Sequence, residues 1–252
     1  MEPIRDYKLE EVLRSAVSDG CERRQARAAT GALHPLHWRQ LSQYALSHAI
    51  NDYFALPSQA RHPQLLPVLL ERRWTNRCGA FDSLEHFAQI RQRLGSEMAR
   101  LLEGRHSDEP LLRFEQWETH HPQLRRRLSM IFQLVMSAEV EDGCAADGSR
   151  LETADDLRNG QRYIVQKYVV DDSEELLRAF CHYTTVFCSS AFPRLPERIE
   201  IYSLLTGRCE VMHPVSNHLQ QSVDYVRLAL SLLPAEAPSR EKSAEGAICW
   251  VN

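Results

Sequence analysis

A lysine lies at the centre of an apolar segment that is otherwise typical of a β-strand. Residues 162 to 170 read RYIVQKYVV, and six of these nine residues are β-branched or aromatic. Lys167 is either a surface lysine without a role or a residue kept for chemistry. Because an ammonium group on a flexible stem attracts phosphate as a point charge, Lys167 is a candidate phosphate contact.

Three consecutive arginines, Arg125, Arg126 and Arg127, form a second group with potential chemistry. A guanidinium group pairs with phosphate oxygens through two parallel hydrogen bonds, so the run predicts a nucleic-acid contact. The same run also fits a solvated entrance to a strand. Both interpretations stay open at this point.

The composition limits the classes of protein to consider. The chain has 252 residues, 43% of them hydrophobic and 25% charged, with a formal net charge of -4. These values are ordinary for a globular protein and exclude a globally basic nucleic-acid binder, although not a local basic groove. No apolar run approaches the roughly 20 residues that span a bilayer. The opening MEPIRDYKLEE lacks the apolar core of a signal peptide, so we expect a cytoplasmic protein without a membrane partner.

The seven cysteines are scattered and odd in number, which favours reduced thiols. Cys181 and Cys188 are the closest pair, and no two cysteines have the spacing usual for zinc or iron–sulfur ligation. The sequence therefore predicts no bound metal, and the cysteines are interpreted as small buried hydrophobic residues.

Helical periodicity dominates the first part of the chain. We predict helices over residues 7–18 and 36–55, a further one through LLERRW, and another that starts near Ser83 and ends near Gly104. Residues 1–109 are therefore interpreted as a helical N-terminal region with an insert.

The predicted secondary structure changes from helices to strands at about residue 110. LLRFEQWETH, RRLSMIFQLVMSAEV and RYIVQKYVV are predicted strands, with a Gly- and Asp-rich connection before the third. A helix capped by Ser173 follows, then strands in RIEIYSLL and RCEVM and a last helix in NHLQQSVDYVRLALSLL. This order predicts an α/β core over 110–233, with a central mixed sheet of about five strands and a crossover helix. Residues 234–252 are expected to form a flexible tail.

The order of elements and the residues at their joints resemble the RecB-type branch of the PD-(D/E)XK nuclease superfamily. In that branch a helix carries a His, three strands carry acidic residues and a Lys, and a crossover helix carries a Gln and a Tyr. Here His48, Glu115, Lys167 and Tyr183 match those positions, and Leu204 to Gly207 match the closing turn. The resemblance spans about residues 45 to 230 and implies a restriction-endonuclease-like fold. On an amphipathic helix, however, a histidine such as His48 is more often a core or rim residue than a ligand.

The most diagnostic acidic positions of the resemblance carry other residues. Gln133 replaces the aspartate of the second strand, Val165 replaces the acidic residue two positions before Lys167, and Ala179 replaces the helical glutamine. The nuclease chemistry needs magnesium held by carboxylates. Gln133 offers only a neutral carbonyl and Val165 offers nothing.

The resemblance thus implies a catalytically inactive nuclease domain without a cofactor. We expect it to bind DNA or RNA, or to scaffold the protein subunits of a complex for DNA repair, recombination or antiviral defence. The alternative is an active magnesium-dependent deoxyribonuclease whose carboxylates have migrated, and the nearby candidates are Asp155, Asp156, Asp171 and Asp172.

Overall fold

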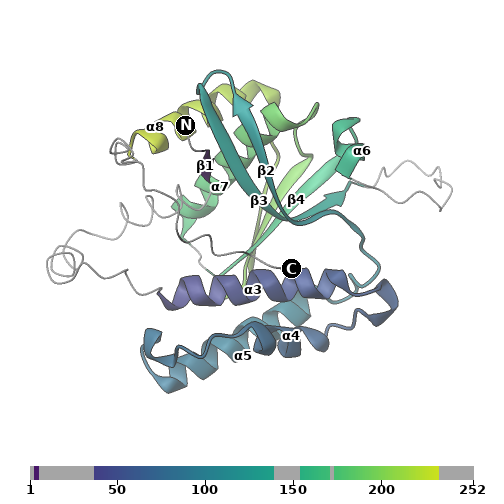
Figure 1. The fold of residues 1–252 in the computed structure, drawn as a ribbon, viewed down its shortest axis with the longest axis vertical. Coiled ribbons are helices and arrows are strands. Elements are labelled where there is room, and N and C mark those ends of the chain that lie inside the picture. The colour runs from purple at the N-terminus through teal and green to yellow at the C-terminus, as the bar shows by residue number, and fades with distance from the viewer. Residues whose placement is uncertain (1–2, 6–36, 139–153, 171–172, 233–252) are drawn as a thin grey trace, which may run out of the picture.

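The computed structural model describes residues 3–5, 37–138, 154–170 and 173–232, and it has a mixed α/β fold (Figure 1). A central mixed sheet of six strands is flanked by helices on both faces. This confirms the predicted fold class, including the helical region that precedes the sheet. The predicted helix 7–18 and the predicted tail 234–252 lie outside the described residues.

Three helices form one layer below the sheet in Figure 1. They are α3 (Trp38–Ala55), α4 (Leu65–Arg73) and α5 (Leu84–Leu101), with single 3₁₀ turns at Ser58–Ala60 and Cys78–Ala80. Helix α5 starts with the predicted cap, because Ser83 accepts a hydrogen bond from the His86 N–H at 2.9 Å. Gly104 follows α5 with φ at +76°, a conformation that glycine adopts without strain.

The strands make one continuous sheet. They are β1 (Ile4–Arg5), β2 (Pro110–His121), β3 (Arg126–Ser137), β4 (Tyr163–Val169), β5 (Arg198–Ser203) and β6 (Arg208–Met212). Strands β2, β3 and β4 are antiparallel neighbours, β5 is parallel to β4, and β6 is antiparallel to β5. The short β1 pairs in parallel with the first half of β3 and was not predicted from the sequence.

The second layer of helices covers the other face of the sheet. Helix α7 (Glu174–Ala191) connects β4 to β5, as expected for a crossover helix, and α8 (Leu219–Ser231) packs on α7 after a 3₁₀ turn at Ser216–His218. A short helix, α6 (Ala154–Arg158), interrupts the connection that the sequence assigned to loop. Within the described ranges, no helix combines the length and apolar character needed to cross a bilayer.

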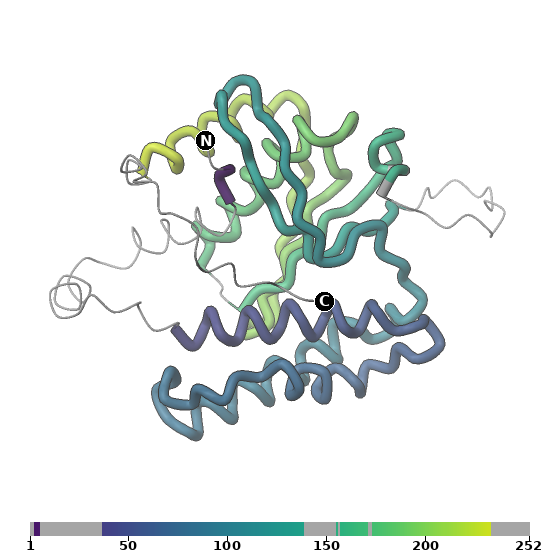
Figure 2. The backbone as a smooth tube through the Cα atoms, in the orientation of Figure 1, coloured from purple at the N-terminus to yellow at the C-terminus, as the bar shows by residue number. Residues whose placement is uncertain are grey.

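Each face of the sheet has its own hydrophobic core, so the two layers are distinguishable by their contacts. Phe132, Val165 and Val169 pack with α7 and α8, whereas Leu134 and Tyr168 pack with α3, α4 and α5. Below, these are called the α7 face and the α3 face. Figure 2 shows how the long β2–β3 hairpin bends across the sheet between these layers.

The alternation of side chains in β3 slips by one residue at its centre. Phe132 lies on the α7 face, but the next two side chains, Gln133 and Leu134, both lie on the α3 face, and Val135 returns to the α7 face. The slip lies opposite Phe114 of β2, whose φ is +53°. Because side chains normally alternate along a strand, this irregularity sets the face on which every later side chain of β3 points.

Candidate functional site

Gln133, which replaces an acidic residue in the nuclease resemblance, is buried and fully engaged with the backbone of β4. Its Oε1 accepts the Tyr168 N–H at 2.7 Å, and its Nε2 donates to Ser47 Oγ at 2.8 Å and to the Tyr168 carbonyl at 3.2 Å. The β3–β4 ladder ends at the pair of Leu134 and Gln166. The amide of Gln133 therefore takes the place of the next ladder hydrogen bonds.

Gln43 of α3 extends this clamp. Its Nε2 donates to the Tyr168 carbonyl and its Oε1 accepts the Val170 N–H, both at 2.9 Å. Two glutamines from different layers thus satisfy the end of β4, where an unpaired buried backbone group would be costly.

Val165 lies on the opposite face from Gln133. It is 1% exposed and belongs to the core beneath α7, whereas Gln133 contacts α3. The two positions that carry acidic residues in the resemblance are therefore separated by the sheet itself. Substituting carboxylates at both would not bring them to one ion.

Lys167 is half-buried on the α7 face, two residues after Val165. Its Nζ lies 4.0 Å from the ring centroid of Phe180, so a cation–π contact stabilises the ammonium group beneath α7. Phe180 is 9% exposed, which makes this a largely desolvated contact. The charge at the centre of β4 thus has a structural partner.

Tyr183, the tyrosine of the crossover helix, joins α7 to the sheet. It is 1% exposed, and its hydroxyl lies 2.8 Å from the Ile4 carbonyl and 3.0 Å from the Ser129 carbonyl. It therefore holds the edge of β3 where β1 pairs. The preceding position of interest, Ala179, is a buried residue of the same core.

His48 contacts Phe114, the residue that precedes Glu115 in β2. The His48 ring is 4.8 Å from the Phe114 ring and 4.2 Å from the Tyr44 ring. Burial, assisted by the charge of Arg73, lowers the pKa of His48, and Asp52 opposes this effect. The shift favours the neutral imidazole, and His48 packs as part of an aromatic cluster with Tyr44 and Phe114.

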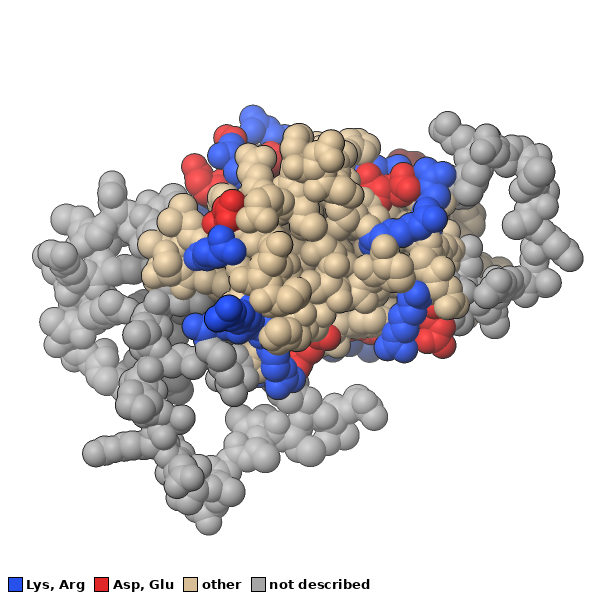
Figure 3. Space-filling view, turned by 90° about the horizontal axis from the view of Figure 1, so that it is seen from above, with Lys and Arg blue, Asp and Glu red and all other residues tan. Residues whose placement is uncertain are grey.

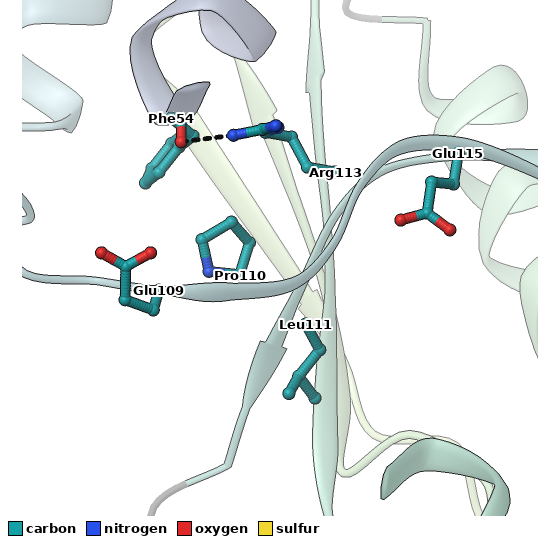
Figure 4. A pocket seen from close by; sticks show the side chains of 6 residues that line it. All are labelled: Phe54, Glu109, Pro110, Leu111, Arg113 and Glu115. Atoms are coloured by element: carbon teal, nitrogen blue, oxygen red, sulfur yellow. Dashed lines mark hydrogen bonds between the residues drawn. The ribbon is translucent and has the colours of Figure 1, made fainter. Parts of the chain in front are cut away.

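Glu115 is exposed and lines a shallow hollow between the end of α3 and the start of β2 (Figure 4). The hollow has a volume of about 230 Å³ and is lined by Phe54, Glu109, Pro110, Leu111, Arg113 and Glu115. Arg113 reaches across it and donates to the Phe54 carbonyl at 2.7 Å. Glu109 pairs with the buried Arg61 at 3.1 Å, and Glu115 accepts the Trp117 indole N–H at 3.2 Å.

These residues do not fit a magnesium ion. Magnesium requires several oxygen ligands in near-octahedral array. The side-chain oxygen of Gln133 already accepts the Tyr168 N–H, and the side chain of Val165 has no oxygen atom. Glu115 lies in the separate hollow. In the part of the chain that the structure describes, no three His, Cys, Asp or Glu side chains gather as a metal-binding group. Of the proposed migrated carboxylates, Asp155 is exposed and pairs with Arg158 at 3.3 Å. The side chains of Asp156, Asp171 and Asp172 lie outside the described residues.

No family model matches the sequence, and a search of curated proteins finds no match.

The arginine run lies at the tip of the β2–β3 hairpin. Arg125 occupies the turn with φ at +48°, and Arg126 and Arg127 begin β3, all three exposed. Arg127 forms an ion pair with Glu118 across the hairpin. In the view from above (Figure 3), basic and acidic side chains lie next to one another around an uncharged centre. Any phosphate contact on this face therefore depends on local clusters.

A buried polar network lies on the α3 face and was not predicted from the sequence. Glu200, 7% exposed, accepts hydrogen bonds from Gln166 at 2.6 Å and Tyr202 at 2.8 Å, and it also pairs with Arg198. Arg105 continues the network by donating to Gln166 at 3.0 Å. The signal in the sequence was a glutamate between two isoleucines in RIEIYS, analogous to Lys167 in its own strand.

Proposed function

We propose that this chain is a non-catalytic protein of the RecB-like nuclease type, and that it binds nucleic acid within a complex for DNA repair, recombination or antiviral defence. The order α3, β2, β3, β4, α7, β5, β6 agrees with the order that the resemblance implies. The free thiols of the described cysteines support a reducing compartment, which favours the cytoplasm.

One observation carries the non-catalytic part of this proposal. Gln133 and Val165 occupy opposite faces of the sheet, and each is used by the fold, the first as a backbone clamp and the second as core. A two-carboxylate metal site at these positions is therefore incompatible with the packing. This packing supports the non-catalytic part of the proposal.

A cleavage assay tests the proposal. Purified protein is incubated with single-stranded and double-stranded DNA in magnesium or manganese, and we expect both substrates to stay intact. Metal-dependent cleavage that is lost in both Glu115→Ala and Lys167→Ala would instead establish the deoxyribonuclease alternative.

A salt titration then separates the two kinds of partner. Binding through phosphates weakens steeply as salt rises, because counterions are released from the nucleic acid. If the wild-type protein retains no salt-dependent affinity for DNA or RNA, scaffolding of protein subunits becomes the function of the fold.

A further inference from the structure

Strand β6 is the last strand on its side of the sheet, and its outer edge is open. Among the described residues, β6 has only β5 as a strand neighbour. The residues from Arg208 to Val211 are all exposed, and Val211 is 50% exposed. An open edge presents backbone N–H and C=O groups that can pair with a further strand. We call Arg208–Met212 the open edge.

The open edge lacks the features that most often keep a sheet edge from pairing. Such features are prolines, β-bulges and charges that repel a further strand. The open edge contains no proline, and it pairs with β5 in one unbroken register. Its two charged residues, Arg208 and Glu210, have opposite signs, so they do not repel every incoming strand. A strand that carries the complementary charges can therefore be added here.

The side chains of the open edge alternate between the two faces of the sheet. Glu210 lies opposite Ile201, a core residue of the α7 face, so Arg208 and Glu210 both point to that face. Cys209 lies opposite Tyr202, which packs on the α3 face. Neither Arg208 nor Glu210 forms an ion pair with another described residue. Both charges are therefore available to a partner strand.

We propose that two copies of this chain associate through the open edge, with their β6 strands antiparallel about a two-fold axis that is perpendicular to the sheet at Cys209. In this register Arg208 of each copy lies opposite Glu210 of the other, so opposite charges meet at two positions. An axis at Glu210 or at Arg208 would instead place like charges opposite each other. Charge complementarity thus selects one register, in which the two sheets become continuous.

The short length of the open edge sets the strength of this association. Five residues make a small interface, and small interfaces are typical of weak or transient complexes. We therefore expect monomer and dimer to be in equilibrium, with the dimer favoured as the protein concentration rises. This inference goes beyond the proposed function, because it requires neither nucleic acid nor the absence of catalysis.

Charge variants test the register by sedimentation velocity over a range of protein concentration. The wild type should shift from monomer to dimer as the concentration rises. Glu210→Lys places like charges opposite each other at both positions and should weaken dimerisation roughly tenfold. The double variant Arg208→Glu/Glu210→Arg restores opposite charges in the same register and should recover dimerisation, a result that a folding defect does not produce. The control is Glu71→Lys, the same charge change at an exposed position of α4.

Disulfide crosslinking tests the position of the axis. Directly opposite residues of antiparallel strands have Cα atoms about 4.5 to 5.5 Å apart, a separation that a disulfide spans. Cys209 is a free, exposed cysteine. Diamide, which takes up the two thiol hydrogens, should therefore join Cys209 of one copy to Cys209 of the other. Four other cysteines are first replaced by serine, namely Cys21, Cys78, Cys144 and Cys249.

Four results would overturn the proposal. The first is a wild type that sediments as a monomer at every concentration, and the second is an equal effect of Glu210→Lys and Glu71→Lys. The third is a double variant that fails to dimerise. The fourth is the absence of a crosslinked dimer on a non-reducing gel, because the two Cys209 thiols would then not lie opposite each other.

Discussion

Gln133 has a role in the folded structure that its side-chain hydrogen bonds define. Its single amide satisfies both backbone groups of Tyr168, and a hydroxyl of α3 holds that amide in place. A carboxylate at this position would accept one of these hydrogen bonds but could not donate the others. The identity of residue 133 is thus fixed by hydrogen-bond geometry.

Gln133→Leu should therefore destabilise the protein. The substitution keeps the volume but leaves the Tyr168 N–H without its partner, and each unsatisfied buried group costs about 1 to 3 kcal/mol. Urea unfolding followed by circular dichroism measures the loss. Gln89→Leu, at an exposed position of α5 whose amide donates to the exposed Glu85, is the control and should cost less than about 1 kcal/mol. Equal losses would argue against the clamp.

Glu200 gives the molecule an acid-sensitive element. Burial tends to raise the pKa of its carboxyl, but hydrogen bonds from Arg198, Tyr202 and Gln166 outweigh burial and lower the pKa below 4.5. A lowered pKa in the folded state means that the stabilisation is present above the unfolded pKa and is lost as the pH falls through the folded one.

The free energy of unfolding should accordingly decrease as the pH is lowered from about 4.5, the ordinary value for a glutamate. Glu200→Gln should lower the stability at neutral pH by about 1 to 3 kcal/mol and make the acid-side decrease shallower. Thermal unfolding from pH 3 to 7 or so compares the two proteins. Parallel profiles would show that other carboxylates govern the acid response.

At the scale of elements, the hairpin tip combines strain with charge. Arg125 adopts a left-handed conformation that costs a non-glycine residue about 1 kcal/mol, although its side chain is exposed.

Arg125→Gly should raise the free energy of unfolding by about 0.5 to 1 kcal/mol, because the turn is relieved of strain. Arg126→Gly, one residue later in extended β3, removes the same charge and should be destabilising by a similar amount. Guanidinium chloride unfolding distinguishes the two signs. A loss of stability in both variants would mean that the Arg125 side chain itself supports the turn.

Sequence patterns predicted the elements whose amphipathic or apolar runs are long. The helix that begins after Ser83 and the strands β2 to β6 were found from periodicity and turn residues. β1 has only two residues and α6 only five, too few for any period, so both were missed. The slip in β3 could not be seen either, because both faces of this strand are buried and its apolar residues do not alternate. Without the slip, Gln133 and Val165 looked like neighbours of one site.

At the scale of the whole molecule, the sheet lies between two layers of helices, and specific side chains connect each layer to the strands. Tyr183 is one of them, since its hydroxyl lies within hydrogen-bond distance of the carbonyls of Ile4 and Ser129. It therefore couples the α7 layer to the pairing of β1 with β3.

Tyr183→Phe should cost about 1 kcal/mol of stability and loosen β1. Hydrogen exchange measured by mass spectrometry should show faster exchange in peptides that contain β1 and the first half of β3, with β5 unchanged. Tyr44→Phe, an exposed position on α3, is the control. Unchanged exchange in β1 would mean that the hydroxyl does not hold this strand.

The slip in β3 also has an evolutionary consequence. If an ancestor of this chain carried a metal site, reversing the two visible replacements would not restore it, because Gln133→Asp and Val165→Glu would place their carboxylates on opposite faces of the sheet. Recovery would also require a one-residue deletion or insertion in β3 that re-aligns the strand, and such a change would disrupt the clamp on Tyr168. For such an ancestor, recovery of the metal site would therefore pass through a less stable intermediate.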